Sequence, residues 1–139
     1  MEVRKYQEAD RRGLVELWRA VFPDNSPHNE PEKMIDAKLL IDDLIFVAVK
    51  AEGVIGACMA GYDGHRGWLY AVAVSPTCRG HGVGRLLISK AEQALHELGC
   101  IKINLQIRSD NAEVQRFYES IGYTTEPRIS MGKRLTPGE

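Results

Sequence analysis

Hydrophobic residues at helical spacing mark the first third of the chain. Leu14, Trp18 and Val21 recur at i, i+4 and i+7, which predicts a helix that begins at Asp10 and ends at Val21. The side chain of Asp10 is of the type that caps helix N-termini. A second helix is predicted over residues 31–43, since proline suits its first position.

The pattern then changes from helical spacing to nearly continuous apolar runs. Longer strands are predicted at 44–50, 54–62 and 68–74, separated by turns that contain glycine. These three strands form a meander, and a short strand at 3–6 precedes the first helix.

The last third of the chain returns to mixed spacing. A helix is predicted at 84–98, a strand with strict alternation at 101–107 and a helix at 112–121. Residues 123–135 are expected to be mostly extended, with an interruption at Pro127. The order β-α-α-β-β-β-α-β-α-β predicts an α/β fold with a mixed sheet, in which the long helix makes a right-handed crossover between parallel strands.

Composition narrows the class of protein. The chain has 139 residues, 44% of them hydrophobic and 27% charged, which is typical of one soluble domain over 1–139. A formal net charge of -1 argues against partners such as nucleic acid or an anionic membrane surface. No apolar stretch approaches the roughly 20 residues of a membrane span, and no apolar signal region follows the first residues.

Cysteine spacing argues against two further classes. Cys58, Cys78 and Cys100 are odd in number and far apart, and no C-x-x-C pair occurs. Neither a disulfide framework nor a metal site is therefore predicted. Reduced thiols in the cytoplasm are the simplest interpretation.

The segment with the clearest chemistry joins the strand at 68–74 to the helix at 84–98. It reads Arg-Gly-His-Gly-Val-Gly over residues 79–84. Glycines allow a ligand to approach the backbone, and a helix N-terminus offers unpaired N–H groups with partial positive charge. With Arg79 and Arg85 on either side, the loop is suited to phosphate groups, most plausibly a pyrophosphate.

Spacing excludes two common phosphate loops. The nucleoside-triphosphate loop G-x-x-x-x-G-K-[ST] is absent, and the dinucleotide pattern G-x-G-x-x-G fails because Arg85 stands where its third glycine belongs. The remaining pattern is R-x-x-G-x-G, formed by Arg79, Gly82 and Gly84. The alternative is a glycine-rich turn that only reverses the chain.

A second motif gives the loop a context. Residues 111–123 follow the pattern N-x-x-x-x-x-F-Y-x-x-x-G-[FY], from Asn111 to Tyr123. With both motifs in this order, essentially the whole chain resembles the GNAT superfamily of acetyl-CoA-dependent N-acetyltransferases. Among its members, the chain is most similar to small bacterial enzymes of the ribosomal-protein alanine acetyltransferase type.

The resemblance implies a binding mode for acetyl-CoA, the expected cosubstrate. In the family, the fourth and fifth strands splay apart, and the pantetheine arm lies along the backbone of the fourth strand. The pyrophosphate lies on the glycine loop, where His81 contributes an amide and keeps its imidazole exposed. Arg79 then either supplies charge at the rim or is a solvated surface residue. The residues so assigned to acetyl-CoA are Val72, Ala73, Val74, Arg79, Gly80, His81, Gly82, Val83, Gly84, Arg85, Asn111 and Tyr118.

Catalytic roles follow from the same resemblance. Tyr118 corresponds to the tyrosine near the cofactor sulfur and is the candidate general acid for the departing thiolate, because phenol and thiol pKa values lie close together. The alternative is a half-buried aromatic residue beside Phe117. Asn111 either touches the cofactor arm or only caps its helix. Seven residues complete nearly two helical turns, so both side chains are expected on one face.

The general base is not assigned. Similar enzymes often carry a glutamate on the fifth strand, but this chain has Gln106 in that segment, and an amide cannot act as a base. A water chain, a carboxylate such as Asp63 or Glu126, or bulk solvent remains open.

The acceptor is equally open. The resemblance implies a primary amine, either a protein N-terminus or a small molecule, that enters opposite the cofactor near the first two helices. A polar loop there either lines the route of the acceptor or is a solvated connection; its residues are Asp24, Asn25, His28, Asn29 and Glu30.

Three functions compete at this point. The first is an acetyltransferase, and the second is a non-catalytic module that binds acyl-CoA, which Gln106 favours and Tyr118 opposes. The third, a nucleotide-dependent oxidoreductase, is disfavoured by the failed dinucleotide pattern. Oligomeric state, a homodimer included, is left open.

Overall fold

The computed structural model describes residues 1–23 and 27–136. The chain divides into two compact units, Met1–Leu105 and Gln106–Glu139, and each is described by itself. The expectation of a single domain over 1–139 stays a prediction.

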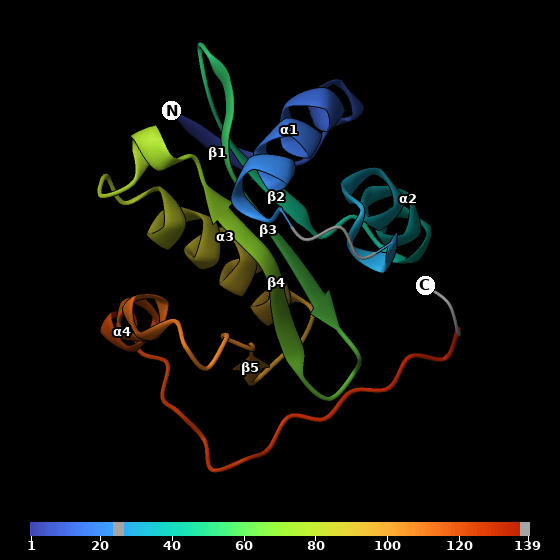
Figure 1. Ribbon diagram of the computed structural model, residues 1–139, viewed down its shortest axis with the longest axis vertical. Coiled ribbons are helices and arrows are strands. Elements are labelled where there is room, and N and C mark those ends of the chain that lie inside the picture. Colours follow the sequence, from blue (N-terminus) through green and yellow to red (C-terminus); the bar gives the residue numbers. More distant parts are fainter. Residues whose placement is uncertain (24–26, 137–139) are drawn as a thin grey trace. The chain divides into compact units, whose positions relative to one another are not determined.

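The first unit is built on a five-stranded mixed sheet with the order β1-β2-β3-β4-β5 (Figure 1). Its strands are β1 (Glu2–Lys5), β2 (Ile45–Lys50), β3 (Gly53–Tyr62), β4 (Gly67–Val74) and β5 (Ile103–Asn104). Neighbours are antiparallel from β1 to β4, whereas β4 and β5 are parallel. Parallel neighbours need a crossover, and α3 (Val83–Glu97) provides it.

Helices cover both faces of this sheet. On one face, α1 (Arg11–Val21) and α2 (Pro31–Ile41) bury an apolar cluster with Ala57 of β3; Leu14, Trp18 and Ile35 are at most 1% exposed. On the other face, α3 packs so closely on Gly56 that an added Cβ would lie 2.9 Å from side-chain atoms of Val83 and Leu87. Successive residues of a strand point to opposite faces of the sheet, so Gly56 faces α3 and Ala57 faces α1 and α2.

Short 3-10 turns connect several of these elements. They are η1 (Glu8–Asp10), η2 (Pro27–Asn29) and η3 (Pro76–Cys78). Within the described residues, no helix is both long and apolar enough to cross a membrane. Those residues also contain no cluster of His, Cys, Asp and Glu that could hold a metal ion.

The second unit contains one helix, α4 (Ala112–Ser120), followed by a segment without regular structure up to residue 136. The helix begins at Asn111, whose side-chain oxygen accepts a hydrogen bond from Val114 N at 3.1 Å. Two backbone N–H groups, of Ile121 and Tyr123, return to the carbonyl of Tyr118 at 3.1 and 3.0 Å and end the helix.

The predicted fold class is confirmed, and two strand predictions need correction. The strand expected at 101–107 contains only Ile103 and Asn104, and the segment 123–135 forms no strand. Ile129 and Met131 alternate as in a strand but are 91% and 92% exposed. Alternation predicts a strand only where one face is buried and a partner strand supplies hydrogen bonds.

Candidate functional site

The β4 and β5 strands separate almost as soon as they meet. Their register pairs Gly67 with Ile103 and Trp68 with Asn104, and Gly67 N donates to Lys102 O at 2.9 Å. Beyond Trp68, the rest of β4 is paired with β3 alone among the described residues. The splayed fourth and fifth strands expected from the sequence are therefore present.

One edge of β4 is left for another partner. Ser75 N donates to Ile55 O of the preceding strand at 2.8 Å, and Val74 pairs with Gly56. Because antiparallel hydrogen bonds alternate along a strand, the backbone groups of Val74 and Val72 point to the opposite edge. Exposed backbone donors and acceptors of this kind need a ligand, water or a side chain.

A β-bulge precedes this open edge. The β3–β4 register shifts between Ala57 and Met59, so that Cys58 alone lies opposite both Ala71 and Val72. Ala71 has φ = 48°, the one positive φ of a non-glycine residue in the part of the chain that the structure describes. The sequence contains no signal for this bulge, so Ala71 is not among the residues predicted for the site.

The glycine loop lies between the carboxyl end of β4 and the first turn of α3. Gly80 and Gly82 have φ of 82° and 80°, which side chains rarely adopt, and an added Cβ would meet nothing within 4 Å. Space beside both residues is thus open to a ligand.

The N-terminus of α3 has no side-chain cap. Its N-cap is Gly82, and the first helical hydrogen bond runs from Leu86 N to Gly82 O at 3.1 Å. The N–H groups of residues 83–85 therefore find no partner within the helix. Uncapped N–H groups and the helix dipole together favour an anion.

Packing fixes this loop at both ends. The side chain of Val83 is 3% exposed against Gly56, and Cys78 is buried and donates its backbone N–H to Ser75 O at 2.8 Å. Arg79 turns back toward the strand, and its Nε donates to Val74 O at 3.1 Å. Arg79 therefore touches the open edge of β4, while His81 and Arg85 are exposed.

The candidate residues of the second unit lie on α4. Tyr118 is 7% exposed, and its ring makes edge contacts with Phe117 and Tyr123 at centroid distances of 5.2 and 5.6 Å. The oxygen of Asn111 is engaged as the N-cap, as the structural alternative expected. Gln106 is exposed and donates from Nε2 to Ser130 Oγ.

The structure bears on the open question of a base. Asp63 lies in the β3–β4 turn, where its Oδ1 accepts from Arg66 N at 2.7 Å and His65 N at 2.8 Å. These bonds hold the pKa of the Asp63 carboxyl below its usual range. A carboxylate stabilised in this way is a weak base with a structural task, and Asp63 also helps burial to raise the pKa of nearby Tyr70.

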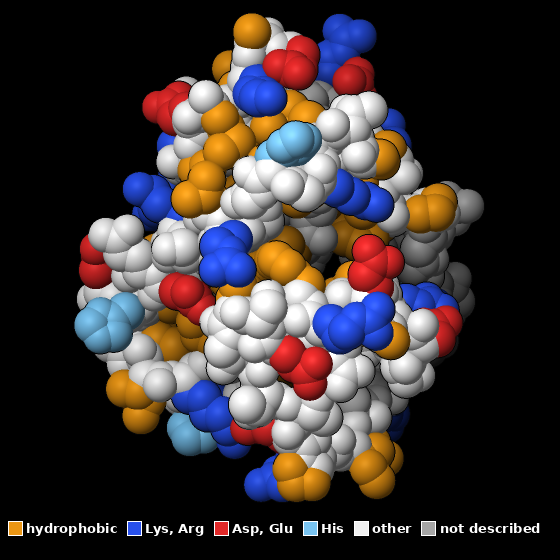
Figure 2. All heavy atoms as spheres, turned by 90° about the vertical axis from the view of Figure 1, so that its left-hand side faces the viewer, with side chains coloured by type: hydrophobic (Ala, Val, Ile, Leu, Met, Phe, Trp, Pro, Cys, Tyr) orange, Lys and Arg blue, Asp and Glu red, His pale blue; other side chains and the backbone are white. Residues whose placement is uncertain are grey.

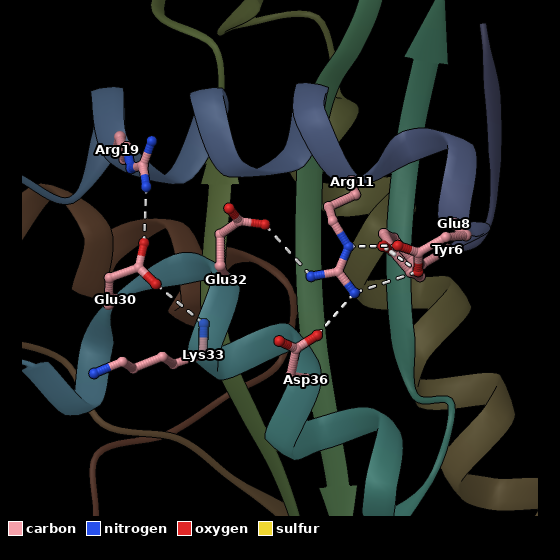
Figure 3. A network of polar contacts seen from close by, with 8 residues as sticks. All are labelled: Tyr6, Glu8, Arg11, Arg19, Glu30, Glu32, Lys33 and Asp36. Atoms are coloured by element: carbon pink, nitrogen blue, oxygen red, sulfur yellow. Dashed lines mark hydrogen bonds and ion pairs between the residues drawn. The ribbon is translucent and has the colours of Figure 1, made fainter.

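Ion pairs lock α1 against α2 near the expected acceptor side (Figure 3). Arg11 reaches Glu8, Glu32 and Asp36 at 2.5, 3.5 and 2.8 Å. Its hydrogen bonds to Glu8 and then to Asp36 raise the pKa of its guanidinium. Arg19 binds Glu30 at 2.8 Å.

The polar loop expected to line the acceptor route has a partly structural role. Glu30 caps α2 by accepting from Lys33 N at 3.1 Å, and Arg19 above all holds the pKa of its carboxyl low. His28 and Asn29 are exposed, whereas Asp24 and Asn25 lie outside the described residues.

One face of the molecule carries Lys and Arg side chains interspersed with Asp and Glu (Figure 2). Both signs of charge on this face accord with the formal net charge of -1.

Comparisons with known proteins extend this description. The sequence model of the Acetyltransferase (GNAT) family matches residues 11–123. An acetyltransferase of Yersinia enterocolitica is 40% identical over 136 residues, which cover 97% of this chain and 96% of the relative.

Solved structures share the fold at low identity. An aminoglycoside N-acetyltransferase in complex with CoA aligns at a TM-score of 0.80 and 17% identity, covering 97% of this chain and 95% of that one. The glucosamine-6-phosphate N-acetyltransferase of Arabidopsis thaliana aligns at a TM-score of 0.73 and 22% identity, covering 97% and 98%.

Proposed function

This chain belongs to the Acetyltransferase (GNAT) family, and from that premise we propose that it moves an acetyl group from acetyl-CoA to a primary amine. Membership makes acyl transfer its class of reaction; the donor, the acceptor and the residue roles are the proposal. One observation carries it: the uncapped α3 is the next long helix after the open edge of β4, and only η3 and the glycine loop lie between them.

The glycine loop is proposed to bind the pyrophosphate of the donor. Backbone N–H groups of residues 81–85 supply the hydrogen bonds, and the helix dipole adds favourable potential. The positive φ of Gly80 and Gly82 supports this role, because residues with a side chain rarely adopt it. Arg85 and Arg79 add full charges, and the bond of Arg79 to Val74 O also orders the loop.

The open edge of β4 is proposed to bind the pantetheine arm. The backbone groups of Val72 and Val74 would pair with the arm's amides much as a neighbouring strand would, while Ala73 between them directs its backbone groups to β3. Their side chains remain part of the packed sheet, with Ala73 3% exposed. Recognition of the arm through the main chain therefore leaves the packing of these side chains unchanged.

Acetyl transfer is proposed to occur by direct attack within a ternary complex. The amine nitrogen attacks the thioester carbonyl, so that a C–N bond forms as the C–S bond breaks. Tyr118 gives its phenolic proton to the departing thiolate. The proton that the amine loses passes to solvent, since no base is assigned, and a proton from solvent restores the phenol. The family pattern supports this role of Tyr118, and Asn111 is proposed to contact the donor arm through its amide nitrogen.

The acceptor class stays broad within this proposal. Two proteins of the same fold are named for acetylating aminoglycosides and glucosamine 6-phosphate, both of which carry amines. A small amine or a protein N-terminus is therefore the proposed acceptor.

The three free, buried cysteines suit the cytoplasm as the location of this protein. A homodimer stays an expectation.

A thermal-shift panel tests the donor site. Acetyl-CoA at about 100 times its Kd should stabilise the protein by about 2.7 kcal/mol, whereas ATP and NAD at the same concentration should give no comparable shift. Absence of any shift with saturating acetyl-CoA and CoA would overturn the proposal.

A non-catalytic acyl-CoA-binding module is the second candidate function. Gln106 favours it, because the carboxylate base of similar enzymes is missing at that segment. Thiol release measured across a panel of amines and peptides separates the two, since a module that only binds acyl-CoA would release no CoA above the rate of spontaneous hydrolysis.

A further inference from the structure

The bulge in β4 is held in a conformation that its own residue disfavours. Ala71 has φ = 48°, where the Cβ of an L-residue crowds the backbone. Such a conformation persists when surrounding contacts over-determine it. The contacts around Ala71 are therefore part of what shapes the strand.

Trp18 provides the specific contact. Its indole Nε1 donates to Ala71 O at 2.9 Å, across 53 residues of sequence. The helix α1 places Trp18 in the apolar cluster, where it is 1% exposed. If the carbonyl of Ala71 moved away, the indole N–H of this buried side chain would lose its hydrogen-bond partner, which is costly.

The bulge decides which backbone groups face the open edge. With it, Ala73 lies opposite Ala57 and Val74 opposite Gly56. Without it, continuous pairing from Met59 and Tyr70 would bring Val72 opposite Ala57. A slip of one residue exchanges the inward and outward groups along the strand.

We propose that Trp18 is a positioning residue for the acyl donor: by holding the carbonyl of Ala71, it fixes the bulge and directs the backbone groups of Val72 and Val74 at the pantetheine arm. This inference rests on the proposed function, because it assumes that the open edge of β4 binds the donor. Trp18 itself acts only through Ala71.

The test first removes the indole N–H of Trp18 and then relieves the strained backbone at position 71 that this N–H holds. Trp18→Phe keeps an aromatic ring without the N–H and should raise the Kd for CoA about tenfold by titration calorimetry. Ala71→Gly should bind CoA within twofold of the wild type, because glycine adopts positive φ without strain. The double variant should regain most of the affinity that Trp18→Phe loses.

A matched control separates positioning from packing. Ile35→Val removes one methyl group from the same cluster and should lower the melting temperature while leaving the CoA Kd unchanged. If Trp18→Phe fails to fold, a variant with benzothienylalanine at position 18 is used instead. This side chain retains the shape of the indole but has no N–H.

Amide hydrogen exchange gives a readout without CoA. Faster exchange at residues 71–74 is expected in Trp18→Phe, with recovery in the double variant. The inference would be overturned by unchanged CoA affinity in a folded variant that lacks the indole N–H. It would also be overturned if Ala71→Gly restored none of the affinity that the variant at position 18 loses. If the wild type binds no CoA, the proposed function fails. Unchanged amide exchange in Trp18→Phe would independently contradict the role of Trp18 in holding the bulge.

Discussion

Gly82 shows how one residue's backbone shapes the proposed binding site. Its φ of 80° begins α3 without a side-chain cap, and the space beside it is open. The sequence predicted that glycines would let a ligand approach this backbone. The structure adds that two of them, Gly80 and Gly82, also need a conformation that side chains disfavour.

Replacing Gly82 by valine should therefore weaken CoA binding at least about 100-fold, because the side chain fills the open space and strains the backbone. Titration calorimetry measures this loss. Gly64→Val is a matched control, since Gly64 has φ = 90° in the β3–β4 turn, with nothing within 4 Å of an added Cβ. It should lower stability and keep CoA affinity; equal CoA affinity in both variants would contradict the loop's role.

Tyr118 carries the proposed chemical step. Tyr118→Phe removes only the phenolic oxygen from a ring held between Phe117 and Tyr123. We expect kcat to fall about 100-fold, with the Kd for CoA within twofold of the wild type. Steady-state kinetics with an identified amine acceptor measure this.

The neighbouring phenol supplies the comparison for that variant. Tyr123→Phe makes the same chemical change in the same aromatic cluster, and its kcat should stay within twofold of the wild type. An unchanged kcat in Tyr118→Phe would remove Tyr118 from the mechanism.

At the scale of elements, the start of α1 differs from its prediction. Asp10 stands at the N-cap position, but its side chain makes no capping bond to α1. Its carboxylate instead accepts from Gln7 N at 2.8 Å and from two nitrogens of Arg4 at 2.7 and 3.0 Å. The residue thus ties β1 to the turn before α1.

Asp10→Ala should lower the free energy of unfolding by about 2 kcal/mol, because charged hydrogen bonds are lost at a mostly buried position. The corresponding fall in melting temperature is about 6 °C. Asp10→Asn keeps an acceptor for Gln7 N–H and should lose less. A change of less than about 1 °C in Asp10→Ala would show that this tie contributes little.

At the scale of the whole molecule, several carboxylates share one pH dependence. Hydrogen bonds and ion pairs lower the pKa of Glu8, Asp10, Glu30 and Asp63, with Arg11, Arg4, Arg19 and the Arg66 N–H as the respective main causes. Their stabilisation is complete above the ordinary carboxyl pKa of about 4 and is lost as pH falls through the lowered values.

Urea unfolding should therefore give a nearly constant free energy between pH 5 and pH 7 from these groups and a decline below about pH 4. Asp10→Ala should make the decline shallower, since one of the groups is removed. A decline of equal steepness in both proteins would contradict the contribution of Asp10.

Local patterns carried much of this fold, because they depend on neighbours in sequence. Helical spacing, proline at a first position and capping residues predicted α1, α2, α3 and α4, and the glycine loop was identified where a strand meets a helix. The N-cap at Asn111 was also predictable, since its bond to Val114 spans only three residues. In each case the chemistry of a few adjacent residues suffices.

The tertiary structure alone decided three further features. The bulge at Ala71 depends on its register with β3 and on Trp18, which is 53 residues away in sequence. The short β5 and the absence of a strand at 123–135 depend on which strand edges find partners. The sequence by itself thus determines where a glycine loop at a helix N-terminus forms, because that is local backbone chemistry. The path of the adjoining strand edge follows instead from contacts between residues that are distant in sequence.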